Sequence, residues 1–145
     1  MNDKTFINIL DNISKKEKTP STYAAFLTTL FNGYNEGLGL LGIYAVENKK
    51  DRLLFIGDAN NKTLLFFTKR EYFYKLKKNT APEMQSDIYC RYFSCREIIN
   101  NILDDTTIAG IIFNVYEKNR FDLARVYFEK YFEEGFFERI EPNVD

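Results

Sequence analysis

Two stretches of the chain decide its fold: LLFFTKREYFYKLKK, from Leu64 to Lys78, and YFSCREIINNILDDTTIAGIIFN, from Tyr92 to Asn114. Each begins with a short run that is typical of a β-strand and continues into a segment with apolar residues at helical spacing. The second stretch leads into AGIIFNV, residues 109–115, which is the strongest strand signal in the chain. The two stretches predict strand–helix units, and neither contains a recognisable catalytic group.

The segments on either side predict further helices and an antiparallel meander. Apolar residues at helical spacing indicate an N-terminal helical segment, residues 3–33, broken near Pro20 and ended by Asn32-Gly33. Three short apolar runs are separated by turns rich in Asn and Asp, which predicts a three-stranded meander. These runs are Leu41–Val46, Leu53–Gly57 and Thr63–Thr68.

Later segments complete the predicted fold. Residues 70–78 suit a short helix, residues 79–87 a loop, and residues 121–134 a final amphipathic helix. Ser94 and Glu97 have the S-x-x-E spacing of a capping box, which predicts the start of a helix. We therefore expect one α+β domain, residues 1–145, with a central, mainly antiparallel sheet of about five strands flanked by helices.

Composition indicates a soluble globular protein. The chain has 145 residues, of which 45% are hydrophobic and 28% charged, values that are ordinary for one domain with its own core. No apolar run approaches the roughly 18 residues of a membrane span, and the N-terminus does not resemble a secretory signal. We expect a cytoplasmic protein that does not bind membranes.

Charge is unevenly distributed, although the net charge is only −1. Basic residues gather in residues 69–78, where Glu71 is the only acid, and acidic residues dominate after Phe128. Two solvated helix faces are the simpler interpretation, and a docking surface is the alternative. The candidate interaction residues are Lys69, Arg70, Tyr74, Lys77, Lys78, Glu129, Glu133 and Glu134.

The sequence has no catalytic or metal-binding motif, and its one nucleotide-binding pattern is not flanked by the required strand and helix. Residues 37–42 match G-x-G-x-x-G, but they follow a predicted helix and open a strand, the reverse of a dinucleotide site. The chain contains no histidine, which removes the common triads and the zinc sites that depend on histidine. Cys95, at a predicted helix start, would have a lowered thiol pKa if the helix dipole acted on it. We expect no catalytic residue, cofactor or metal.

A family resemblance rests on the two opening stretches. A strand that ends in Phe67-Thr68 and leads into a helix, followed later by a helix and the strand Gly110–Asn114, resembles the N-terminal-domain family of SseB, the bacterial enhanced-serine-sensitivity protein. Val115 stands where that family usually has proline. The resemblance covers roughly residues 40–131 and implies a small α+β module without transferable catalytic residues. Similar modules near bacterial toxin systems imply an immunity protein.

Three functions remain as hypotheses. The first is a non-enzymatic protein-interaction module, specifically an immunity or inhibitor protein, supported by the uneven charge and by an aromatic content of 17%. The second is an enzyme or small-ligand-binding protein that uses a pocket with Cys95 or with carboxylates such as Asp58 and Asp104. The third is weak nucleic-acid binding through Lys69–Lys78, which the net negative charge disfavours. The identity of the protein partner and the oligomeric state, including a homodimer, stay open.

Overall fold

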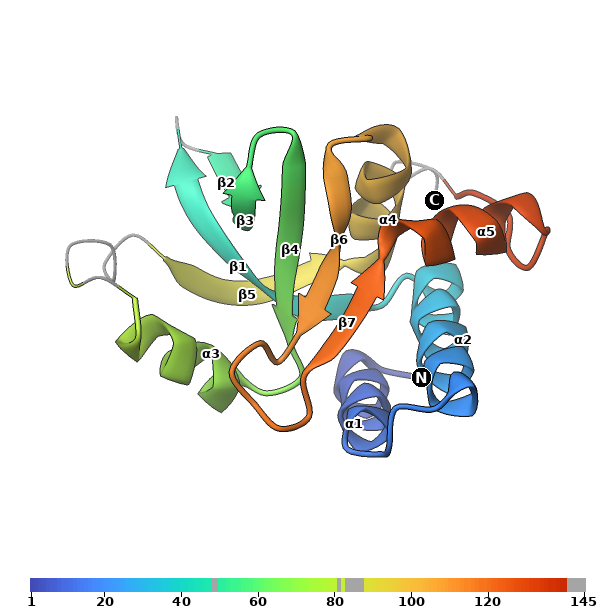
Figure 1. The fold of residues 1–145 in the computed structure, drawn as a ribbon, viewed down its shortest axis with the longest axis horizontal. Coiled ribbons are helices and arrows are strands. Elements are labelled where there is room, and N and C mark those ends of the chain that lie inside the picture. The colour runs from blue at the N-terminus through green and yellow to red at the C-terminus, as the bar shows by residue number, and fades with distance from the viewer. Residues whose placement is uncertain (48–49, 81, 83–87, 141–145) are drawn as a thin grey trace.

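Seven strands form one mixed sheet with helices on both of its faces (Figure 1). The structure is a computed structural model that describes residues 1–47, 50–80, 82 and 88–140. The helices of the described chain are α1 (Asp3–Ser14), α2 (Pro20–Glu36), α3 (Arg70–Lys78), α4 (Cys95–Asp104) and α5 (Arg125–Glu133). The strands are β1 (Gly39–Glu47), β2 (Lys50–Leu53), β3 (Phe55–Asp58), β4 (Asn61–Phe67), β5 (Tyr89–Ser94), β6 (Ile108–Phe113) and β7 (Phe121–Ala124).

The sheet is antiparallel except for one pair of strands. Along one edge, β1 pairs with β5. Along its other edge, β1 pairs first with β4 and then, nearer its end, with β2, so that Leu41 lies opposite both Tyr92 and Phe67. β3 pairs with β4, and β2 and β3 together therefore lie between the diverging ends of β1 and β4. β6 runs parallel to β4 and pairs antiparallel with β7. The predicted α+β class and meander are confirmed.

Three sequence-based boundaries were wrong. The predicted strand Leu53–Gly57 is interrupted at Leu54, whose N–H donates to the Ile43 carbonyl at 3.1 Å. Gly33 does not end α2; the helix continues to Glu36 and is capped by Gly37, whose φ of 71° is the left-handed conformation that glycine adopts readily. Residues 121–124 form β7 instead of the first helical turn, because Phe121 and Leu123 are buried at alternating positions against β6.

Helix starts depend on caps that the sequence only partly predicted. The Asn2 side chain accepts a hydrogen bond from the Thr5 N–H, and Thr19 caps α2 in the same way. Ser94 is the N-cap of α4 as expected, but its side chain makes no capping hydrogen bond. The first residue of α4, Cys95, instead donates its backbone N–H to the Leu38 carbonyl at 2.8 Å. The predicted loop at residues 79–87 lies mostly outside the described residues.

Aromatic rings hold the helices on the two faces of the sheet. Phe26 of α2 stacks on Phe121 at 4.2 Å and meets the edge of Phe113 at 4.8 Å. On the other face of the sheet, Phe73 of α3 packs against Phe67 of β4. Phe66, the preceding residue of β4, points to the first face and contacts Phe113, because successive side chains of a strand alternate between the two faces. Each of these buried side chains contributes about 1.5–3 kcal/mol relative to an exposed position. Much of the unusual aromatic content is therefore core.

A buried polar network joins α1 to the carboxyl ends of the parallel strands β4 and β6. Thr68, just after β4, donates its hydroxyl to Asp11 Oδ1 at 2.6 Å, and its backbone N–H donates to Asn114 Oδ1 at 3.0 Å. Asn119 Nδ2 donates to both Asp11 Oδ1 and Ser14 Oγ. All five side chains are buried. The network satisfies polar groups that would otherwise cost free energy in the interior.

We predict that Thr68→Val destabilises the fold although it preserves the shape of the side chain. The substitution removes the hydroxyl donor of a buried carboxylate, and the free energy of unfolding should fall by about 1–3 kcal/mol. Urea unfolding measures the loss. Thr63→Val, at a half-buried position of β4, is the matched control and should cost less than about 0.5 kcal/mol. Equal costs for the two variants would contradict the role of the network.

We also predict that the contribution of Asp11 to stability depends on pH. Burial by itself raises the pKa of Asp11, but Thr68, Lys15 and Lys69 outweigh it and hold the pKa below the ordinary value of 3.8. A lowered folded-state pKa stabilises the fold above the unfolded value, and this contribution is lost as the pH falls through the folded value. The difference in unfolding free energy between the wild type and Asp11→Asn should therefore be constant near neutral pH and shrink below pH 3.8. A difference that grows on acidification would refute this assignment.

Candidate functional site

The predicted interaction residues lie on two separate surfaces. Lys69 precedes α3, and Arg70, Tyr74, Lys77 and Lys78 belong to it. The acidic residues Glu129 and Glu133 belong to α5, and Glu134 follows it. Figure 1 places α3 and α5 at opposite ends of the long axis of the molecule. The structure therefore brings the basic residues together but keeps the acidic residues away from them.

The basic residues of α3 are held against the edge strand β5. Arg70 lies over the Tyr92 ring at 5.6 Å, and Lys77 lies over the Tyr89 ring at 5.8 Å. The same two side chains donate to the carbonyls of Cys90 and Ile88, at 3.5 and 3.4 Å. Basic side chains on an edge strand also discourage unwanted pairing of strands. We call this surface the basic face; it consists of Lys69, Arg70, Tyr74, Lys77, Lys78, Tyr89 and Tyr92.

Much of the charge on the basic face is not neutralised. In the described part of the chain, no carboxylate lies within 4.0 Å of the charged groups of Arg70, Lys77 or Lys78. Lys69 is different, because it approaches Asp11 Oδ2 at 4.0 Å and Glu71 at 3.9 Å. The exposed Tyr74 ring adds apolar area beside these cations. The face combines free positive charge with exposed aromatic rings.

Two of the three candidate acidic residues at the α5 end, Glu129 and Glu134, have cationic neighbours. Arg125 forms an ion pair with Glu129 and donates further hydrogen bonds to the carbonyls that close α4 and open β6. Lys130 lies 3.9 Å from Glu134. These pairs follow the i, i+4 spacing that stabilises a helix. The acidic residues near α5 are therefore partly explained as helix-stabilising partners.

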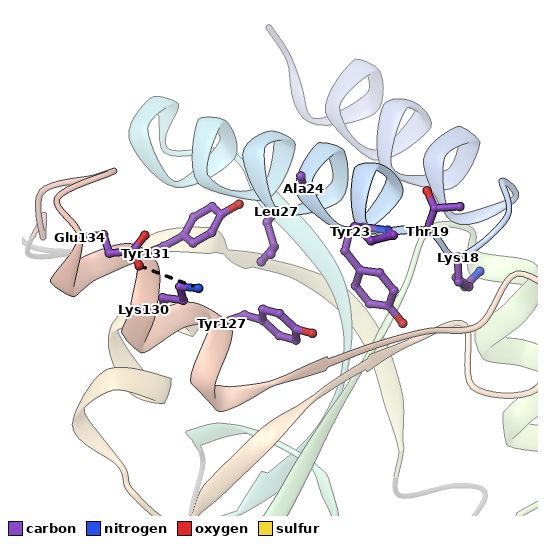
Figure 2. A pocket seen from close by; sticks show the side chains of 10 residues that line it. Lys18, Thr19, Tyr23, Ala24, Leu27, Tyr127, Lys130, Tyr131 and Glu134 are labelled. Atoms are coloured by element: carbon purple, nitrogen blue, oxygen red, sulfur yellow. Dashed lines mark ion pairs between the residues drawn. The ribbon is translucent and has the colours of Figure 1, made fainter.

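A groove lies between α2 and α5 (Figure 2). It has a volume of about 480 Å³, and Tyr23, Leu27, Tyr127 and Tyr131 form much of its wall. Figure 2 shows Lys18 at one end of the groove and the pair of Lys130 and Glu134 at the other. We call it the α2–α5 groove. Its size falls within the range of small-ligand sites, about 300–1,000 Å³.

Ring contacts fix the wall of the α2–α5 groove. Tyr127 stacks on Tyr23 with ring centroids 6.1 Å apart, and Tyr131 stacks on Phe31 at 5.2 Å. Sequence analysis missed this site because about a hundred residues separate the two helices. The i, i+4 spacing of Tyr127 and Tyr131 places both rings on one side of α5, but the same spacing is typical of core residues. Only the tertiary fold shows that the rings border a hollow.

The residues considered for catalysis do not converge. Cys95 is completely buried, and burial raises the pKa of its thiol far above the ordinary value, so the expectation of a lowered pKa was wrong. Asp104 is exposed and forms an ion pair with Arg139, whereas Asp58 lies exposed at the end of β3. Residues 37–39 end a helix and open a strand, which confirms that the glycine pattern is not in a dinucleotide-binding context.

The described residues contain neither a metal-binding cluster nor a helix that could span a membrane. No group of three or more acidic, cysteine or histidine side chains is placed to hold a metal ion there. None of the helices in that part of the chain is both long enough and apolar enough to cross a membrane. The basic face and the α2–α5 groove are thus the two surfaces of the described chain that suit a ligand or partner.

We predict that the thiol of Cys95 is inert in the folded protein. In a Cys90→Ser variant, Cys95 is the only thiol, and its reaction with Ellman's reagent should be more than about 100-fold slower than in urea, because reaction requires opening of the core. In a Cys95→Ser variant, the half-buried Cys90 should react faster than Cys95 does in the first variant. Rapid native-state labelling of Cys95 would overturn this assignment.

Comparison of the chain with protein-family models, with curated proteins and with solved structures found no match. The resemblance to the SseB N-terminal-domain family therefore stays a prediction based on the residues quoted for it.

Proposed function

We propose that the chain is a non-enzymatic protein-interaction module whose basic face docks an acidic segment of a partner protein, as an immunity or inhibitor protein would. The observation that carries the proposal is that Arg70, Lys77 and Lys78 have no carboxylate within 4.0 Å among residues 1–47, 50–80, 82 and 88–140. A partner that supplies carboxylates would complete ion pairs that these three side chains do not make with any described residue. Complementary charge of this kind accelerates association and selects partners.

The geometry of the basic face supports binding without a large conformational change. Arg70 and Lys77 are already ordered by the Tyr92 and Tyr89 rings and by carbonyls of the β5 segment. Binding therefore costs less side-chain entropy than it would for freely rotating lysines. Tyrosine and arginine are also the residues that contribute most to protein interfaces. The exposed Tyr74 is suited to pack against an apolar residue of the acidic segment.

The α5 end is a weaker candidate for the same function. Its glutamates Glu129 and Glu134 already have cationic neighbours, so a basic partner would have to compete with those pairs. Exposed ion pairs contribute only about 0–1 kcal/mol, so breaking these pairs would cost a basic partner a small amount of binding free energy. We therefore assign the docking surface to the basic face and not to the acidic residues.

The test is a titration of the protein with a fluorescein-labelled peptide rich in Asp, Glu and Phe, followed by fluorescence anisotropy. We expect saturable binding that weakens as salt is added, because the interaction is electrostatic. The variant Lys77→Glu with Lys78→Glu should weaken binding at least tenfold, about 1.4 kcal/mol. The matched control, Lys4→Glu with Lys16→Glu, makes the same change in net charge on exposed residues away from α3 and should leave binding within about twofold.

Two outcomes would contradict the proposal. The first is absent peptide binding, or binding that the control variant weakens as much as the α3 variant. The second is tighter binding of an oligothymidine of comparable charge, because cations stacked with aromatic rings also suit single-stranded nucleic acid. Circular dichroism of each variant must match that of the wild type before its affinity is compared.

A further inference from the structure

The α2–α5 groove has the composition of a small-molecule site. Three tyrosine rings and Leu27 supply an apolar wall, and Lys18 and the ion-paired Lys130 supply polar ends. Small-molecule sites combine a predominantly apolar lining with a few placed polar groups in this way. In the described part of the chain, the hydroxyls of Tyr23 and Tyr127 make no hydrogen bond, so both are available to a ligand.

Lys18 gives the groove a cation that has no anion. Its ammonium donates to the Ser14 carbonyl at 2.8 Å and lies over the Phe121 ring at 5.1 Å. No carboxylate lies within ion-pair distance in the described chain, and Asp122 acts on it only at longer range. Lys18 is an exposed residue, but the burial of part of its side chain lowers its pKa, so the Ser14 carbonyl and the Phe121 ring offset only part of the hydration that the charged form loses. An anion bound beside Lys18 would replace it.

The two ends of the groove are electrostatically different. Lys130 lies 3.9 Å from Glu134, so the charge at that end is already balanced. The Lys18 end has no such balance, although it lies along the same line of rings (Figure 2). A ligand that satisfies both the wall and the charge therefore needs an apolar body with an anionic group at one end only.

We propose that the α2–α5 groove binds a small organic anion whose apolar ring or chain packs against Tyr23, Tyr127 and Tyr131 and whose carboxylate meets the ammonium of Lys18. The site lies away from the basic face and does not depend on the docking function assigned to it. The proposal is specific about chemistry: the anionic group and the apolar body must be present in one molecule.

Calorimetric titration with phenylbutyrate tests the charge requirement. Phenylbutyrate carries an apolar ring and a carboxylate, and phenylbutyramide has nearly the same shape without the charge. We expect one saturable site for the acid and at least tenfold weaker binding of the amide. In nuclear magnetic resonance spectra, the ring signals of Tyr23 and Tyr127 should shift on binding of the acid.

Two variants and a control locate the site. Lys18→Met keeps an apolar stem and removes the charge, so it should reduce the affinity for phenylbutyrate to that for the amide. Tyr127→Ser should weaken both compounds because it removes part of the wall. Lys77→Met, on the basic face, is the matched control and should change neither affinity. Equal affinities for acid and amide, an unaffected Lys18→Met variant, or the absence of saturable binding by phenylbutyrate would each overturn the proposal.

Discussion

The buried carboxylate of Asp11 is the constraint on which the arrangement of the elements depends. A charge in the interior is costly unless it is fully hydrogen-bonded and paired, and Asp11 meets both conditions. Its Oδ1 accepts from Thr68 and Asn119, and its Oδ2 lies 2.9 Å from Lys15. These partners come from α1, from the end of β4 and from the loop before β7. The carboxylate is satisfied only when all three segments are in place.

The same network also sets the orientation of α3 and hence of the basic face. Thr68 is the last residue before the chain turns into Lys69 and α3, and its backbone N–H is held by Asn114. Asn114 adopts a φ of 57° and donates its N–H to the Phe66 carbonyl, which fixes the end of β6 beside the end of β4. With its start fixed, α3 lies along β5, where Arg70 and Lys77 reach Tyr92 and Tyr89.

Local sequence signals predicted the elements whose structure is decided locally. The bounds of α3 agree with its apolar spacing, and the meander agrees with its turns. The prediction of a helix over residues 121–124 was wrong, because Phe121 and Leu123 fit the periodic pattern of the following helix as well as that of an alternating strand. Pairing with β6 decides between the two structures. The apolar spacing that predicted the N-terminal helical segment gives no indication that Asp11 is buried. Its burial depends on Thr68 and Asn119, 57 and 108 residues away, and no local pattern contains that information.

Compensation of charge separates the structural ionic groups of this protein from those that suit a ligand. Asp11, Arg125 and Asp104 all have partners within the chain, and each connects elements or closes a helix. Lys18, Lys77 and Lys78 have no carboxylate partner in the described residues, yet Lys18 and Lys77 are held in place by rings and carbonyls. An ordered cation without a carboxylate partner can pair with an external anion at a smaller entropic cost than a freely rotating side chain. The basic face and the Lys18 end of the groove both have this property, although different helices build them. Composition could not distinguish these lysines from the others, because the difference lies in which described residues the fold places beside each ammonium group.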